Sequence, residues 1–236
     1  MKEYSKLQLI QDSVQEIAEA IASALKLDVE IFDDNVVVVG ATGRIRGKIG
    51  FTSKSANVTR QVLASGDSYA VDEPGKHELC QNCVIKTNCF CSACLVCPIN
   101  LKAQIIGTIS LLSFDEAQRI DLTTRQSQYF DFMNRMGELI ANRVQLLDVL
   151  NQTASNQKYL ETIIDSVSEG IVAVDAKGNI SFVNNVVERL FHYRRESLIG
   201  EPVKSFFPNT PLPETLSDRV KIIDKEIEVN IHGVKL

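Results

Sequence analysis

The chain has 236 residues, a formal net charge of −5 and 44% hydrophobic residues, which fits a water-soluble globular protein of one or two domains. Its 25 lysines and arginines are spread along the sequence, so we expect no direct contact with nucleic acid. No apolar run approaches the ~18 residues that a membrane span needs, and the N-terminus lacks the apolar core of a signal peptide. We therefore expect a cytoplasmic protein without a membrane contact.

The first part of the chain predicts an amphipathic helix, a hairpin, a short helix and a strand. The first helix is indicated by apolar residues at helical spacing, namely Ile10, Val14, Ile17, Ile21 and Leu25. Residues 28–32 and 35–39 are β-branched runs separated by Asp and Asn, which favour turns, so they predict the hairpin. Residues 56–64 predict the short helix, and residues 68–75 predict a strand that ends at a Pro-Gly pair.

The second part predicts two further strands and a long helix. Residues 97–114 form the strands around a turn at 102–104, and helical spacing begins at about Leu122. This order of elements predicts an α+β fold with an antiparallel sheet. We expect two domains joined by the long helix, the first at residues 1–150 and the second at 151–236.

The long helix carries a heptad stripe over residues 132–167. It runs through Phe132, Met136, Leu139, Arg143, Leu146, Leu150, Thr153, Gln157, Leu160, Ile164 and Val167. Apolar residues at this spacing favour a coiled coil, so we predict a homodimer through the helix. A helix packed against its own domain gives a similar stripe, and the sequence leaves that alternative open.

The last part of the chain, residues 158–236, resembles a PAS domain. The residues that carry the resemblance are Gly170, Asp175, Gly178, Ile180, Asn184, Leu190, Ile199 and Gly200. The chain ends before the last strands of a typical PAS sheet, so we expect a PAS domain that is incomplete at its C-terminus. His192 stands where many members have Gly, and we expect it at an exposed helix end.

The order of elements before the PAS-like part resembles a GAF domain. A cysteine-bearing insertion, followed by a Pro-Ile strand and the strand IIGTISLLSF, is similar to the GAF-like modules that precede PAS domains in sigma-54-dependent transcriptional activators of anaerobic Firmicutes. The resemblance implies the N-terminal sensory region of a transcription regulator. It also implies AAA+ and DNA-binding domains outside these residues, and no enzyme activity in them.

Six cysteines between residues 80 and 97 are the main candidates for a site. Thiolates select zinc, copper(I) or iron–sulfur clusters, and CxxC turns let two thiolates face one centre. We predict either Zn²⁺ or a 4Fe-4S cluster, with thiol–disulfide switching as a third reading. The expected ligands are Cys80, Cys83, Cys89 and Cys97, with Cys91 and Cys94 as replacements or redox thiols. His77 is either a fifth candidate ligand or the cap of this loop.

Other chemistries have weaker support. Residues 36–48 mimic a dinucleotide-binding fingerprint, but the third glycine is missing and residues 44–51 are more strand-like than helical, so we expect no nucleotide. No catalytic triad is readable. Two alternatives remain open: the input module of a sensor histidine kinase, and a thiol–disulfide oxidoreductase that uses Cys80 with Cys83, or Cys94 with Cys97. A small organic ligand also fits this class of domain, and the sequence identifies none.

Overall fold

The computed structural model describes residues 4–208, 230–231 and 234–235. Contacts within the chain divide it into two compact units, Met1–Leu150 and Asn151–Leu236. Helix α4 (Gln126–Ser166) begins in the first unit and ends in the second. In the part of the chain that the structure describes, no helix is both long and apolar enough to cross a membrane.

The first unit is built on a five-stranded antiparallel sheet with the order β2-β1-β5-β4-β3. The strands are β1 (Asp28–Asp33), β2 (Val38–Ala41), β3 (Tyr69–Val71), β4 (Ala93–Leu101) and β5 (Gln104–Ser113). Strands β1 and β2 form the predicted hairpin, and β4 and β5 form the second one. The predicted α+β class with an antiparallel sheet is confirmed.

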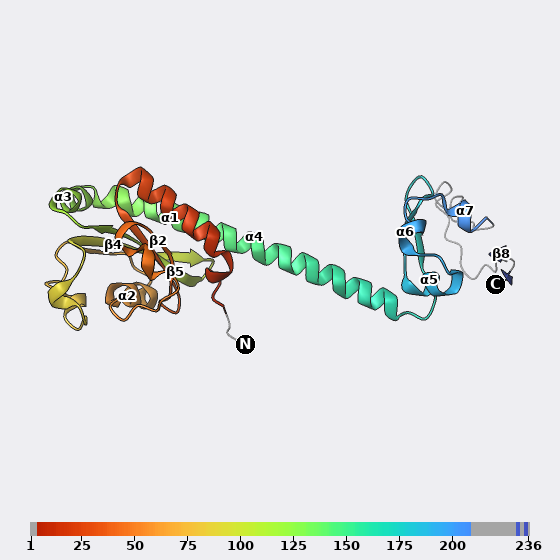
Figure 1. Cartoon of the computed structure of the whole chain (residues 1–236), viewed down its shortest axis with the longest axis horizontal. Helices are drawn as coiled ribbons and strands as arrows, with labels where there is room; N and C mark the ends of the chain where they lie inside the picture. The colour runs from red at the N-terminus through yellow and green to blue at the C-terminus, as the bar shows by residue number, and fades with distance from the viewer. Residues whose placement is uncertain (1–3, 209–229, 232–233, 236) are drawn as a thin grey trace. The chain divides into compact units, whose positions relative to one another are not determined.

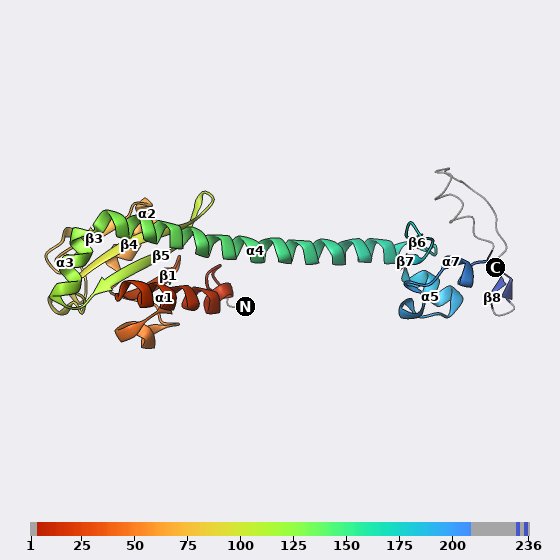
Figure 2. The same cartoon turned by 90° about the horizontal axis from the view of Figure 1, so that it is seen from above.

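Helices lie on both faces of this sheet. They are α1 (Gln11–Leu25), α2 (Asn57–Ser65), α3 (Glu116–Thr124) and the start of α4, with short 3-10 helices η1 (Gln8–Ile10), η2 (Gly43–Lys48), η3 (Glu78–Cys80) and η4 (Lys86–Asn88). Figure 1 shows α1 and α4 on one face and α2 on the other, and Figure 2 shows α1 beside the first part of α4. We call these the helix face and the cavity face.

The helix face holds the larger apolar core. Aliphatic side chains of the sheet, among them Ile31, Leu95 and Ile109, pack there with Val14 of α1 and Met133 of α4. Helix α4 passes beside β4 at Gly137, where a Cβ atom would be in ordinary van der Waals contact with the carbonyl oxygen of Pro98, at 3.5 Å. The alternation of side chains along β1, β4 and β5 sends every second residue to the opposite, cavity face.

Two local predictions are wrong. Residues 43–48 form the 3-10 helix η2 and not a strand, because Gly43 takes a positive φ of 49° and the amide of Ile45 donates to Thr42. The long helix predicted from Leu122 is two helices. The first, α3, begins earlier, where the Asp115 carboxylate caps it by accepting from the Gln118 amide at 2.8 Å.

The second unit contains two strand pairs and three short helices in its described residues. They are β6 (Val172–Val174), β7 (Ile180–Val183), α5 (Asn185–Phe191), α6 (Arg195–Leu198), α7 (Val203–Phe206), β8 (Asn230–Ile231) and β9 (Val234–Lys235). Buried Asn184 ties them together: its side chain donates to the carbonyl of Glu169 at 2.9 Å and accepts from the amides of Ile171 and Val187. His192 is exposed and ends α5 in a left-handed conformation, as predicted. We expect this domain to be incomplete at its C-terminus. The residues that this prediction concerns lie largely outside the described ones.

Helix α4 has two different apolar sides. Its buried residues, namely Tyr129, Met133, Gly137, Ile140, Ala141 and Val144, pack in the first unit. The heptad stripe lies roughly 130° away from them at ~100° per residue, and its Leu139, Leu146, Leu150 and Leu160 are exposed. Its first two residues, Phe132 and Met136, are half-buried against the helix-face core, and the stripe residues from Leu139 to Leu160 are exposed.

Candidate functional site

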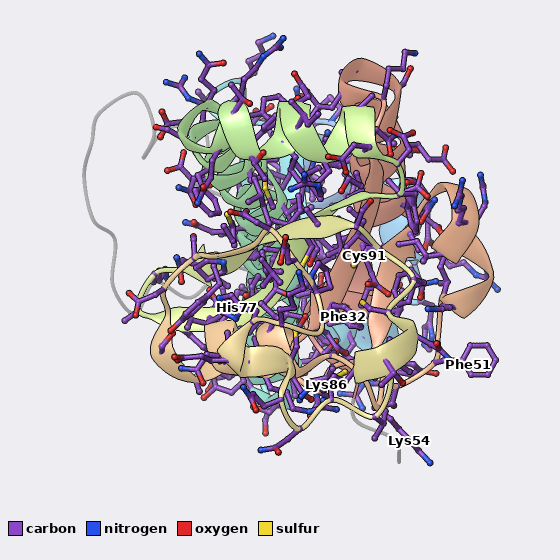
Figure 3. All side chains as sticks on the ribbon, turned by 90° about the vertical axis from the view of Figure 1, so that its left-hand side faces the viewer. Phe32, Phe51, Lys54, His77, Lys86 and Cys91 are labelled. Carbon is purple, nitrogen blue, oxygen red and sulfur yellow. The ribbon has the colours of Figure 1, made fainter. Side chains whose placement is uncertain are left out.

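Five of the six cysteines line a single cavity on the cavity face of the sheet: Cys80, Cys83, Cys89, Cys91 and Cys94. Its floor includes Phe32 and Leu112 of the sheet, and its walls are the start of α2 and the loop of residues 72–92. We call that segment the cysteine loop. The space open to the centre of a water molecule is about 80 Å³, and one water needs ~10–15 Å³. In Figure 3, Phe32 and Cys91 lie in the interior, whereas Phe51 and Lys54 point away.

Short-range hydrogen bonds give the cysteine loop its path. His77 caps η3, because its Nδ1 accepts from the Leu79 amide at 3.2 Å, which is the capping role allowed for it by the sequence. The Cys83 amide donates to the Cys80 carbonyl at 3.1 Å and closes the first CxxC turn. Gly75 has a φ of 90°, and a Cβ atom there would stand 2.6 Å from the Lys86 carbonyl oxygen. A glycine is therefore required at position 75, where the loop passes close to the backbone of Lys86.

Three of the thiols form a chain within the cavity wall. The Sγ atoms of Cys89 and Cys91 are 3.6 Å apart, and Cys91 also interacts with Cys94 on β4. The hydrogen bond with Cys91, with burial, raises the pKa of Cys89 above its usual range. For Cys91 the bond with Cys89 lowers the pKa, but the bond with Cys94 and burial outweigh it and the net pKa is raised. These thiols therefore hold their protons unless a positive centre takes their place.

Cys97 lies apart from the other five. It is fully buried in the helix-face core, with its Sγ 4.0 Å from the Met133 Sδ, because residues 94 and 97 on β4 point to opposite faces of the sheet. Burial raises the pKa of Cys97 to about 11. The predicted quartet of Cys80, Cys83, Cys89 and Cys97 is thus not assembled, and Cys91 and Cys94 stand on the cavity instead. Among the described residues, no three His, Cys, Asp or Glu side chains form a group that could hold a metal ion as placed.

A buried carboxyl group, which the sequence analysis did not single out, also lines the cavity. Glu30 on β1 is 7% exposed and points to the cavity face, opposite its apolar neighbours Val29 and Ile31. Burial raises its pKa from 4.5 to about 7, against the attraction of Lys48, which lowers it. The available signal was an acid placed between the apolar residues Val29 and Ile31 inside a strand.

Aromatic rings and cations lie where the cysteine loop meets η2. The Lys48 ammonium lies 4.0 Å from the centroid of the Phe90 ring, and the Arg44 guanidinium lies 4.7 Å from that of Phe114. The two rings stack with centroids 6.2 Å apart. Phe90 stands between Cys89 and Cys91 in the sequence, so the contact with its ring places the Lys48 ammonium near these thiols. Lys48 and Glu30 both line the cavity.

Comparison with known proteins finds a family match for the second part of the chain and a relative that is similar over most of it. Residues 158–231 match the PAS fold family. An Escherichia coli (strain K12) protein described as a uric acid sigma-54-dependent transcriptional regulator, UacR, is 27% identical over 201 residues, which are 85% of this chain. The chain spans about a third of the length of this curated relative, 34%.

Solved structures share the fold. The crystal structure of the E. coli DhaR(N)–DhaL complex contains a chain with a TM-score of 0.59 and 14% identity, which covers 97% of this chain and 80% of that one. The Aquifex aeolicus nlh2 GAF domain in an inactive state has a TM-score of 0.44 and 15% identity over 61% of this chain and 87% of that one. The chain is thus similar to part of a sigma-54-dependent regulator, and residues 158–231 match the PAS fold that the sequence predicts.

Proposed function

We propose that this chain is the sensory region of a cytoplasmic transcription regulator and that it detects its signal at the cavity lined by cysteines. The observation that carries the proposal is the placement of five thiols from one loop and one strand around a single cavity. The homology to a sigma-54-dependent regulator supports a regulatory output, which lies in residues outside this chain. The histidine kinase alternative is less well supported, because the histidine kinase AtoS of E. coli is also 27% identical but matches only 39% of this chain, against 85% for UacR.

The proposed sensing group is a zinc ion or an iron–sulfur cluster held by thiolates of the cysteine loop. Cys80, Cys83, Cys89, Cys91 and Cys94 supply more soft donors than the four that such a centre needs, and hard cations do not match this donor set. The bound centre would supply the positive charge that favours thiolates over the proton-holding thiols. Gain or loss of the centre would change the order of the loop, and through it the packing of the sheet.

The structure disfavours an oxidoreductase that uses Cys94 with Cys97. A redox-active CxxC pair needs a thiolate of lowered pKa, whereas burial raises the pKa of Cys97. Cys94 and Cys97 face opposite sides of β4 and belong to different cores, so they are not placed to form the predicted redox couple.

We also propose that the chain forms a homodimer through the heptad stripe of α4. Every residue from Asp148 to Ile163 is exposed, and the stripe's Leu146, Leu150 and Leu160 are each more than half exposed. An exposed leucine row at heptad spacing is the seam of a coiled coil, with a second copy of the same helix as its partner.

Organic signals are a second candidate for the cavity. The relative UacR is described with uric acid, and the cavity has the apolar walls that a planar molecule needs, among them Phe32 and Phe90. A planar organic molecule is therefore a second kind of signal to test, by its effect on the melting temperature.

The test of the proposed centre is an anaerobic ultraviolet-visible spectrum with metal and sulfide analysis of the 236-residue chain. Iron with sulfide would assign a cluster, and zinc alone would assign a zinc site. The double variant Cys80→Ser/Cys83→Ser should lose the centre. The control variant Ser92→Ala, in the same loop, should keep it. Protein that binds neither metal under these conditions would contradict the proposal.

A further inference from the structure

Glu30 is a buried carboxyl group without a hydrogen-bond donor in the described residues. Its side chain lines the cavity from β1, the strand next to the centre of the sheet, and the residue is 7% exposed. Its cross-strand partner on β5 is Ser110, which is also buried. The described protein groups supply the charge of Lys48 but no N–H or O–H group hydrogen-bonded to the carboxylate. A buried carboxylate of this kind costs free energy unless something donates to it.

The same face of the sheet has a buried polar group without a partner. Thr108 on β5 is fully buried, and its Oγ1 has no partner among the described residues. It pairs across the strands with Phe32, two residues from Glu30. The helix face is packed with aliphatic side chains, so the polar groups are confined to the side of the cavity.

We propose that Glu30 anchors a small uncharged ligand that donates N–H groups to its carboxylate, such as an amide or a lactam heterocycle. The inference rests on the proposed function, because it makes the same cavity the signal-binding site and names the chemistry of the signal. The cysteine loop then forms the wall that closes over the ligand, and the sheet forms the floor on which it binds.

The surroundings explain why the ligand is uncharged and flat. Lys48 attracts the carboxylate of Glu30, so an anionic ligand would be repelled by the carboxylate and a cationic one by Lys48. Phe32 from the sheet and Phe90 from the cysteine loop both line the cavity and offer faces for a planar ring. Burial raises the pKa of Glu30, and no hydrogen bond from the part of the chain that the structure describes lowers it again. A ligand N–H group could supply that missing hydrogen bond.

The experiment measures binding of paired probes to the 236-residue chain by isothermal titration calorimetry. Uracil and xanthine are planar rings of two sizes with N–H donors, and 1,3-dimethyluracil and caffeine are their counterparts without N–H groups. We expect uracil or xanthine to bind and its methylated counterpart to bind at least tenfold more weakly. Glu30→Gln should weaken the binding of the N–H probe at least tenfold, because the charged acceptor is lost. The exposed control Glu78→Gln should keep it.

Separate readouts distinguish this inference from the proposed metal site. Circular dichroism shows whether Glu30→Gln folds, and metal analysis on the same sample shows whether the thiols still hold their centre. Failure of both probes to bind to metal-loaded protein would overturn the Glu30 inference and leave the metal site standing. Equal binding of the methylated counterpart, or binding unchanged in Glu30→Gln, would also overturn it. Absence of metal with intact probe binding would overturn the metal site alone.

Discussion

The two faces of the five-stranded sheet have opposite characters, although the same strands supply both. The helix face is closed by α1 and α4 over aliphatic side chains, and the cysteine that it holds, Cys97, acts there as a small apolar residue beside Met133. The cavity face is covered by α2, η2 and the cysteine loop. It carries the other five cysteines and the buried acid Glu30.

This difference indicates which face of the sheet stabilises the first unit and which face carries the proposed sensing site. Close packing of aliphatic groups on the helix face stabilises the sheet and leaves no room for a ligand. A buried acid on the cavity face is costly in an apolar core, so its presence beside the thiols points to a binding site. Changes on the two faces should therefore have opposite consequences.

The largest effect is expected on α4, where an apolar side packed in its own unit contrasts with an exposed one. Leu146→Glu with Leu150→Glu places charge in the exposed heptad stripe and should convert the homodimer to a monomer in multi-angle light scattering. Ser155→Glu, which adds charge to the other side of the exposed helix, should leave the mass unchanged. A wild-type chain that is monomeric at all concentrations would contradict the dimer.

Next in size is a truncation in the helix-face core. Ile109 is fully buried, so Ile109→Ala should lower the free energy of unfolding by about 4 kcal/mol through lost burial and a residual cavity. Urea denaturation followed by circular dichroism measures it. A loss below about 1 kcal/mol would mean that the helix face is not the closely packed side.

On the cavity face, removal of a charge should have the opposite sign. The pKa of Glu30 is raised from 4.5 to about 7, so the folded state binds the proton more tightly than the unfolded state. The resulting stability is fully present below pH 4.5 and is lost as the pH rises through 7. Glu30→Gln removes this loss and should be more stable than the wild type by about 3 kcal/mol at pH 8, with a smaller gain at pH 5. Urea denaturation at both pH values checks it, and a Glu30→Gln variant less stable at pH 8 would refute the assignment.

The smallest expected effect is at Cys97. Cys97→Ala deletes one buried sulfur from the helix-face core and should cost about 1–2 kcal/mol, because a small cavity is left beside Met133. Thermal unfolding measures the change. A Cys97→Ala variant that fails to fold would show that the sulfur has more than a packing role.

Much of the fold of the first unit could be predicted from the sequence. The periodicity of Ile10 to Leu25 predicted α1, and the β-branched runs predicted the β1–β2 hairpin, because local spacing determines both. The division of the cysteines between the two faces was not predicted. It depends on where β4 begins: Cys94 and Cys97 both lie inside the strand, so a spacing that suggests one turn places them on opposite sides.

Other misses have the same origin. The 3-10 helix η2 depends on the left-handed Gly43, and the start of α3 on the Asp115 cap, both of which are short-range signals that a search for apolar periodicity passes over. Glu30 was missed because its importance depends on burial by the cysteine loop, which is distant in sequence. An acid that stands between two apolar residues inside a strand is nevertheless a signal by which such a site could be predicted.

The most direct test of the division between the faces compares Cys94→Ser with Cys97→Ser in anaerobically purified protein. The measurement is the molar ratio of bound iron or zinc to folded chain. We predict that Cys94→Ser lowers the ratio by at least half and that Cys97→Ser leaves it at the wild-type value. The reverse result, with the metal lost in Cys97→Ser and kept in Cys94→Ser, would contradict a sensing centre on the cavity face.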